Sequence, residues 1–138
     1  MKTKSFTLVI LAIFGMVIFT NYTSKNTKET DASSLLFMLE EEKLAHDVYT
    51  FLYSKWETRP FANIKESEKV HMQKIQELLD QNKISYEILP EGKFKNQNLQ
   101  KLYNDLTAKG NVSEIEALKA GATIEDVDIY DLQRLTKE

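Results

Sequence analysis

The sequence predicts an all-α protein whose helices pack as a bundle. Apolar residues recur every three or four positions in three long segments, and residues that commonly cap helices precede them. The chain of 138 residues has only 4 Gly and 2 Pro, with 42% apolar and 28% charged residues, which is typical of a folded helical domain. A formal net charge of -3 provides no attraction to phosphates, so we expect no nucleic-acid partner.

Residues 1–30 are predicted to be a targeting segment, and residues 31–138 one helical domain. Two lysines precede a mostly apolar run at residues 6–19, and a polar linker follows, which is the pattern of a signal peptide. The run is shorter than the roughly 20 apolar residues of a spanning helix. No small-residue cleavage site is evident, so an uncleaved membrane anchor is the alternative. In both cases we expect the segment to engage the membrane or the export machinery, and the domain to be periplasmic or extracellular.

The first two helices are predicted to form an antiparallel hairpin. The first begins at Ser33 or Ser34 and ends near Trp56. The second begins at Asn63, which resembles the start of a capping box, and reaches about Asn82. Because the connection between them is short, the two helices should lie side by side in opposite directions.

A long link at residues 83–96 precedes the second half of the domain. An extended piece is expected at residues 84–89. Asn96 then caps a short helix that Gly110 closes. A last long helix starts after Ser113 and runs to about residue 135.

Carboxylates interrupt the apolar faces of the first two helices. On the first, Glu42 falls within an apolar stripe, and on the second Glu68 and His71 occupy positions where core residues are expected. A buried carboxylate is costly unless it is protonated, paired or bound to a metal. The three side chains therefore predict a metal site, the alternative being that Glu68 and His71 only bond each other. The chain has no Cys, which leaves oxygen and imidazole ligands suited to iron, manganese or zinc.

The last helix supplies a fourth candidate ligand. Its expected inward face again combines apolar residues with one carboxylate, Glu125: Leu118, Ala122, Glu125, Ile129 and Leu132. Asp128, at i+3 from Glu125, is a weaker candidate. Tyr49 lies two turns from Glu42, so its hydroxyl is placed to bond a ligand carboxylate from outside the metal's coordination shell.

These motifs resemble a prokaryotic family of uncharacterised ferritin-like domains. The resemblance covers residues 35–135 and depends on four segments: Met38–Tyr49, Phe61–Ile64, Ser67–Met72 and Gly121–Ile129. The spacings Glu-x-x-Ala-x-x-x-Tyr and Glu-x-x-His are also similar to those of rubrerythrin-type proteins. In those proteins such residues hold two iron atoms that react with oxygen or peroxide. The resemblance thus implies a ferritin-like bundle with a di-iron site.

The sequence departs from the ferritin-like pattern at its C-terminal end. After three long helices and one short helix, no fourth core helix with a second histidine ligand follows, so the bundle is expected to be incomplete and C-terminally truncated. His46 falls beside the inward stripe and is expected at the rim. An exposed apolar groove would favour a homodimer. It also leaves a second function open, a non-catalytic, envelope-associated interaction module that has lost its metal site.

Overall fold

The computed structural model describes residues 25–135, and the side chains of residues 31–130. This part of the chain contains four helices and no strand: α1 (Lys25–Trp56), α2 (Arg59–Gln81), α3 (Gln97–Gly110) and α4 (Glu114–Leu135). The prediction of an all-α bundle with three long helices and one short helix is confirmed for these residues. No helix within them is both long enough and apolar enough to cross a membrane. The apolar run at residues 6–19 lies outside the described residues.

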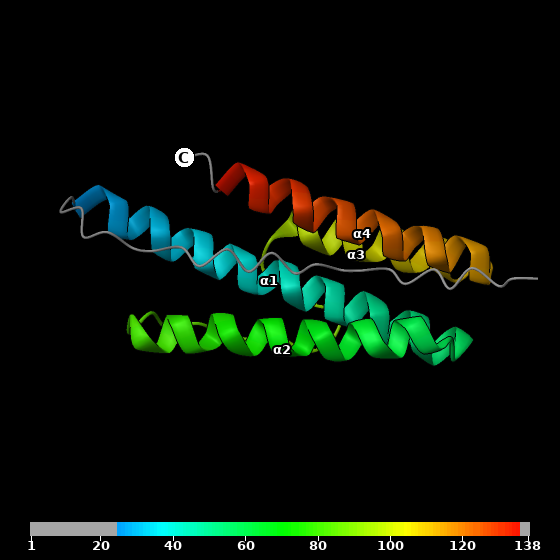
Figure 1. Ribbon diagram of the computed structural model, residues 1–138. Coiled ribbons are helices and arrows are strands. Elements are labelled where there is room, and N and C mark those ends of the chain that lie inside the picture. Colours follow the sequence, from blue (N-terminus) through cyan, green and yellow to red (C-terminus); the bar gives the residue numbers. More distant parts are fainter. Residues whose placement is uncertain (1–24, 136–138) are drawn as a thin grey trace, which may run out of the picture.

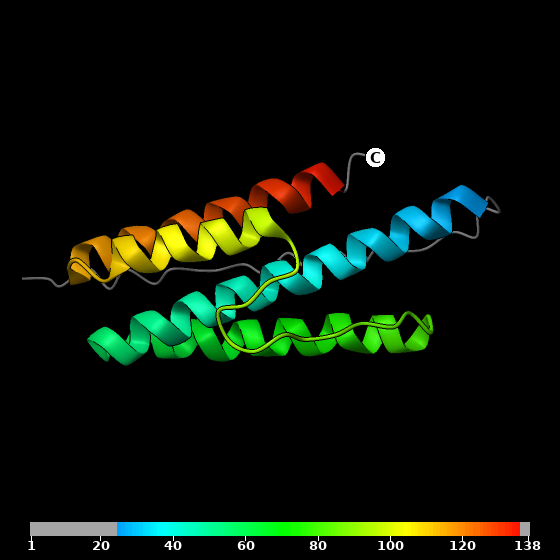
Figure 2. The ribbon, with the colours of Figure 1, turned by 180° about the vertical axis from the view of Figure 1, so that it is seen from behind.

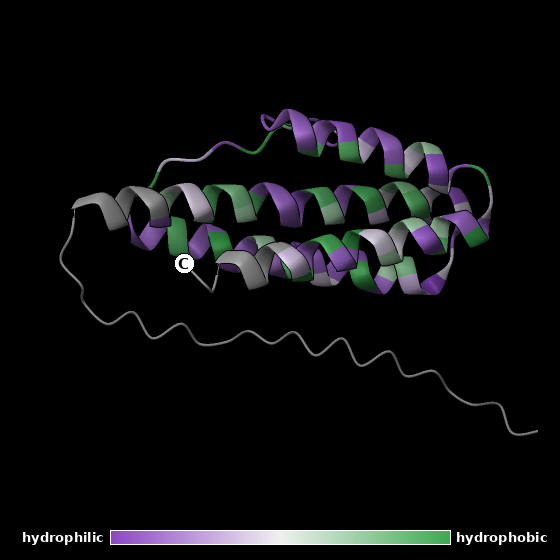
Figure 3. Ribbon diagram, turned by 90° about the horizontal axis from the view of Figure 1, so that it is seen from above, coloured by the Kyte–Doolittle hydropathy of each residue, from purple (hydrophilic) through white to green (hydrophobic). Residues whose placement is uncertain are grey.

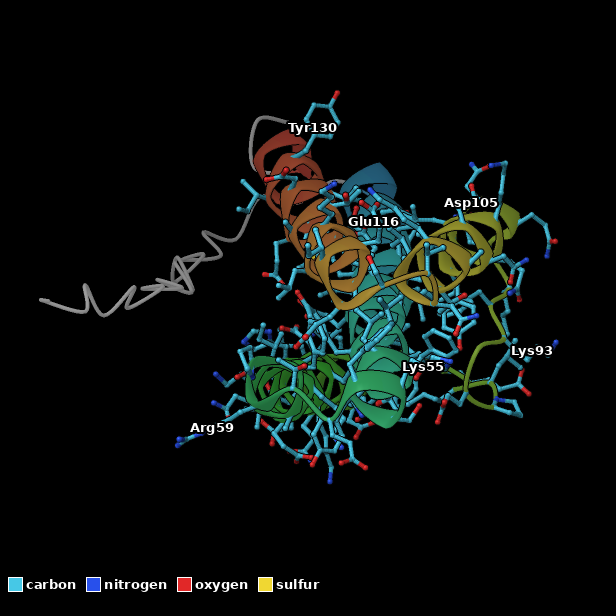
Figure 4. All side chains as sticks on the ribbon, turned by 90° about the vertical axis from the view of Figure 1, so that its right-hand side faces the viewer. Lys55, Arg59, Lys93, Asp105, Glu116 and Tyr130 are labelled. Atoms are coloured by element: carbon cyan, nitrogen blue, oxygen red, sulfur yellow. The ribbon has the colours of Figure 1, made fainter. Side chains whose placement is uncertain are left out.

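Helix α1 is the central element of the bundle. It packs against each of the other three helices, and α3 and α4 also pack against each other (Figure 1). The view along the bundle shows α2 on one side of α1 and the α3–α4 pair on the other (Figure 4). The predicted antiparallel hairpin of α1 and α2 is present, and α4 also runs antiparallel to α1 (Figure 1).

Two apolar clusters hold these helices together. The larger cluster joins α1 to α3 and α4 through residues such as Leu52, Leu106 and Ile124, which are at most 3% exposed. The smaller cluster joins Leu39 of α1 to Ile75 and Leu79 of α2. Hydrophobic and hydrophilic residues alternate along each helix, as expected for helices with one buried face (Figure 3).

Both helices of the hairpin begin earlier than the sequence predicts. Helix α1 starts at Lys25 instead of Ser33 or Ser34, because no Pro or Gly interrupts the residues before these serines. Helix α2 starts at Arg59 instead of Asn63, with Thr58 as the extended N-cap residue. Pro60 is tolerated in the first turn because its missing N–H would have no helical partner there.

The connection between α2 and α3 is irregular, so the extended piece predicted at residues 84–89 does not become a strand. The connection runs beside α2 and then crosses α1 to reach α3 (Figure 2). Ile84 and Tyr86 pack against the smaller apolar cluster instead of pairing with another strand. The predicted cap of α3 is confirmed, since Asn96 accepts hydrogen bonds from the backbone N–H groups of Asn98 and Leu99.

The face of α4 that packs into the core differs from the predicted one. Small residues and one isoleucine are buried, namely Ala117, Ala120, Gly121 and Ile124. Leu118 and Ile129 of the predicted stripe are 48% and 56% exposed. The small side chains let α4 approach α1 closely: a Cβ at Gly121 would lie 3.1 Å from the ring of Tyr49. The larger residues of the stripe therefore lie on the flank of the helix.

Candidate metal centre

Glu42 of α1 meets Glu68 and His71 of α2 inside the hairpin. Each of the three residues offers one ligand atom, and these atoms lie within 4.8 Å of one another. Nδ1 of His71 is 2.9 Å from Oε2 of Glu68 and 3.3 Å from Oε2 of Glu42. Ligands of one ion that are each about 2.0–2.2 Å from it must lie within roughly twice that distance of each other. The cluster therefore has the dimensions of a metal site, with little adjustment needed.

The cluster lies at the edge of the core, with an opening to solvent. The Glu68 side chain is 8% exposed, while His71 and Glu42 are 24% and 23% exposed. Burial raises the pKa of the Glu68 carboxyl group above its ordinary value, a change that the neighbouring Glu42 charge reinforces. Hydrogen bonds to Glu42 and Glu68 raise the pKa of His71 to about 10. The imidazole is therefore protonated at neutral pH while no metal is bound.

The His71 imidazole lies between the carboxylates of Glu42 and Glu68. The proton on Nδ1 of His71 lies between two carboxylates, in the position where a metal ion would also be attracted. A cation and a proton therefore compete for the same three residues. The direct Glu68–His71 contact, which the sequence offered as an alternative to a metal site, is present at 2.9 Å, and both residues also belong to the group of three donors.

Helix α4 faces the same region through Glu125 and Tyr49. The Tyr49 hydroxyl donates a 2.8 Å hydrogen bond to Oε1 of Glu125 and lies 3.1 Å from the carbonyl oxygen of Gly121. Tyr49 is 2% exposed, and its burial and the Glu125 charge raise the pKa of its hydroxyl. Burial likewise raises the pKa of Glu125, and the charges of Glu68 and His71 also act on it. Glu125 nevertheless lies outside the group of three donors.

Asp128 lies one helical turn beyond Glu125. Its Oδ1 atom is buried and has no hydrogen-bond partner among the described residues. Burial, followed by the charges of Glu42 and Glu125, raises its pKa to about 9. A carboxyl group that is enclosed and unpaired in this way is costly to the fold.

The second histidine is not part of the site. Nδ1 of His46 is 3.2 Å from Oδ1 of Asp47, and the His46 side chain is 26% exposed, consistent with the expected rim position. Glu41, the neighbour of Glu42 in the sequence, is buried as well, at 6% exposed. Helix α1 is surrounded by packed elements, so it has less solvent-facing surface than a helix at the edge of a bundle.

A polar network that was not predicted from the sequence lies on the opposite side of α1. Lys43 and Asp47 form a buried ion pair, with side chains 6% and 4% exposed. Asp47 accepts a hydrogen bond from the N–H of Gly92, and Lys43 donates to the carbonyl oxygens of Pro90 and Lys93. The i,i+4 spacing of Lys43 and Asp47 is visible in the sequence, but nothing in it indicates that the α2–α3 connection covers them.

Glu40 extends this network by one turn. Its carboxylate accepts hydrogen bonds from the backbone N–H groups of Lys95 and Asn96, at 2.6 and 3.2 Å. The polar residues within residues 40–49 therefore lie on two different sides of α1. Glu42 and Tyr49 face the candidate metal centre, while Glu40, Lys43 and Asp47 hold the connection that leads to α3.

Comparison with known proteins places the chain in a protein family. Residues 31–138 match the family model described as "Uncharacterized protein domain (DUF2202)". The chain belongs to this family. Its curated relative "Uncharacterized protein MJ0754" from Methanocaldococcus jannaschii is 46% identical over 108 residues, covering 77% of this chain and 58% of the relative. The chain thus spans less than two thirds of that relative's length.

A solved structure shows the same fold. The crystal structure of hypothetical protein MJ0754 from Methanococcus jannaschii DSM 2661 superimposes with a TM-score of 0.75 at 42% sequence identity. The superposition covers 85% of this chain and 66% of that chain. The sequence relationship to MJ0754 and the similarity of the two helical folds therefore support each other. The descriptions of the family and of MJ0754 mention neither a metal nor a reaction.

Proposed function

We propose that this protein is a ferritin-like metal-binding protein that uses carboxylate and histidine ligands. The observation that carries the proposal is the convergence of Glu42, Glu68 and His71 from two helices, with one donor atom from each within 4.8 Å of the others. Two carboxylates and an imidazole form a hard, mixed oxygen and nitrogen donor set, which suits iron and also accepts manganese or zinc. The spacing of these residues along α1 and α2 is that of ferritin-like di-metal proteins.

The proposed activity is oxidation of bound iron by oxygen or peroxide. Bound Fe(II) would supply the reducing equivalents: two Fe(II), one hydrogen peroxide and two protons would give two Fe(III) and two water molecules. The chain's contribution is to hold the ions through Glu42, Glu68 and His71. Glu125 and Asp128 of α4 provide further carboxylates on the side of the site that faces away from α2.

The opening of the site to solvent agrees with this proposal. His71 and Glu42 are each about one quarter exposed, so a small oxidant can reach the donor atoms. We also propose that the domain works outside the cytoplasm, because residues 1–30 have the pattern of a signal peptide or N-terminal anchor.

Metal analysis of the purified chain tests the proposal. We expect iron or zinc to be retained by the wild-type protein and lost from Glu68→Ala and His71→Ala, with helicity by circular dichroism nearly unchanged. His46→Ala is the matched control, because His46 lies outside the donor group and should retain metal like the wild type. Equal metal content in all four proteins would refute the proposal. Loading with Fe(II) and adding peroxide, while Fe(III) absorbance is followed, then tests the oxidation.

A second function is favoured by one observation, the exposed apolar flank of α4. Leu118 and Ile129 are about half exposed on the side of α4 that carries Glu125. Such a flank can bind a partner helix whether or not a metal is present. A protein without metal that still bound a partner through this flank would be an interaction module.

A further inference from the structure

The connection between α2 and α3 contains a stretch of main chain without hydrogen-bond partners. Residues 84–89 contain no turn or bend, and they run beside α2 (Figure 2). The N–H of Ile84 donates a 2.9 Å hydrogen bond to the carbonyl oxygen of Leu79. From Ser85 to Leu89, no main-chain N–H or C=O group is hydrogen-bonded to any described residue. Such groups need either water or the main chain of a partner.

Contacts at both ends hold this stretch in place. Ile84 and Tyr86 pack against the smaller apolar cluster. Beyond Leu89, the N–H of Gly92 donates a hydrogen bond to the buried carboxylate of Asp47. The stretch therefore has a fixed course before any partner binds, which reduces the entropy lost when a partner pairs with it.

A cavity of about 520 Å³ lies between this stretch and residues 33–43 of α1. Its volume falls within the roughly 300–1,000 Å³ that is usual for ligand-binding sites. Three residues of α1 and three of the connection form its apolar lining: Leu36, Phe37, Leu39, Tyr86, Ile88 and Leu89. Ile88 is 40% exposed, so part of this apolar surface faces solvent.

The charged side chains that line the cavity already have partners. Glu40 accepts a hydrogen bond from the main-chain N–H of Lys95. Lys43 is paired with the buried Asp47, and Oε2 of Glu87 lies 2.9 Å from Nζ of Lys95. The cavity therefore offers apolar contacts and unpaired main-chain groups, which fit a peptide better than an ionic ligand.

We infer that an extended peptide segment of a partner protein binds along residues 85–89 as an added strand. In this mode of recognition, main-chain hydrogen bonds supply affinity, and pockets for alternate side chains supply specificity. Because successive side chains of a strand point to opposite faces, every second residue of the peptide can place an apolar side chain in the cavity. The site shares no residue with the candidate metal centre, so it does not depend on the proposed function.

The probe for this site is an acetylated heptapeptide of alternating threonine and leucine, added to the full chain. Hydrogen exchange measured by NMR should show fast exchange of the amides of residues 85–89 without the peptide. At saturating peptide, alternate amides of this stretch should slow by about tenfold or more, because a hydrogen-bonded N–H is protected.

Two N-methylated forms of the peptide test main-chain pairing directly, since both keep all the side chains. Successive N–H groups of a strand point to opposite edges. Methylation of one alternate set should therefore weaken binding by about tenfold or more, and methylation of the other set by less than about threefold. Fluorescence anisotropy of the labelled peptides measures the affinities.

Ile88→Lys tests the position of the site, because it puts a charge into the apolar lining and should weaken peptide binding by about tenfold. Val112→Lys is the matched control, since Val112 is an exposed apolar residue, 74% exposed, that does not line the cavity. It should bind the peptide like the wild type. Circular dichroism should show the same helicity in both variants.

Three results would overturn the inference. The first is absence of peptide binding, and the second is equal binding of the two N-methylated forms. The third is protection of residues 85–89 without any peptide, which would show that the chain covers the stretch itself. That cover would be a second copy if protection rises with protein concentration, and residues 1–24 if it does not.

Discussion

At the scale of single residues, the candidate centre and its surroundings contain side chains with raised pKa values, among them His71 and Asp128. His71 gains a proton because Glu42 and Glu68 surround its Nδ1 atom, which raises its pKa to about 10. Asp128 keeps its proton because burial and neighbouring carboxylates raise its pKa to about 9. Neighbouring carboxylates contribute to both effects. The metal-free protein should therefore carry a pH dependence that originates at this site.

We predict that the free energy of unfolding of the metal-free protein falls as pH rises from about 6.5 to 9. The ion pairs of His71 stabilise the fold fully below its unfolded-state pKa of 6.5, and this stabilisation is lost as pH rises through the folded-state pKa of about 10. Asp128 acts in the same direction, because its folded-state pKa of about 9 exceeds the ordinary value of 3.8, so the unfolded state releases its proton first.

Urea denaturation in the presence of a chelator, at several pH values in this range, measures the effect. Asp128→Asn removes one of these titrating groups and should therefore reduce the slope. A free energy of unfolding that stayed constant or rose across the range would contradict this assignment of charge states.

At the scale of helices, α1 organises the molecule by using different sides for different neighbours. One side carries Glu42 and Tyr49 toward the candidate centre. Another carries Glu40, Lys43 and Asp47, which bind the backbone of the α2–α3 connection. Gly92, with a φ of +72°, lies in this connection and donates its N–H to Asp47. A residue with a Cβ would be strained there and would also meet the ring of Tyr103 at 2.9 Å.

We predict that Lys43→Met destabilises the fold by about 3–5 kcal/mol, because it leaves the Asp47 carboxylate buried without its cation. The exposed pair Lys101 and Asp105 has the same i,i+4 spacing, with side chains 77% and 59% exposed, and provides a matched control. Lys101→Met should change stability by less than about 1 kcal/mol. Chemical denaturation of the two variants measures the difference. Similar small losses in both would show that the buried pair does not hold the connection in place.

At the scale of the whole molecule, α1 packs against each of the other three helices. Phe61 of α2 also reaches the larger apolar cluster that α3 and α4 share with α1, and the candidate centre lies on α1 and α2. The flank of α4 beside Glu125 carries the exposed apolar residues Leu118 and Ile129. Tyr130 is also exposed but points away from the bundle (Figure 4). The apolar flank is therefore the part of the described surface that we expect to bind another helix.

We predict that the chain self-associates through this flank, because Leu118 and Ile129 are about half exposed. Burial of apolar surface contributes about 25 cal/mol per Å², so covering Leu118 and Ile129 in two copies favours a dimer. Sedimentation velocity over a range of concentrations should show association that Leu118→Lys combined with Ile129→Lys reduces.

Tyr130→Lys is the control for this experiment, because it changes an even more exposed residue on another side of α4. All variants keep residues 1–30, so any association through that segment would affect them equally. Equal association of the wild type and the double variant would refute a role for the α4 flank.

The sequence by itself determined the helical class, the hairpin of α1 and α2, and the grouping of Glu42, Glu68 and His71. These features follow from local rules, since helical periodicity places residues three or four apart on one face, and a short connection makes neighbouring helices antiparallel. Tertiary structure decided which face of α4 is buried, because the close approach of Gly121 to Tyr49 selects small residues there. It also decided that Lys43 and Asp47 are buried and that Glu125, not Asp128, is held by Tyr49. These features depend on contacts between segments far apart in the chain, which helical periodicity does not encode.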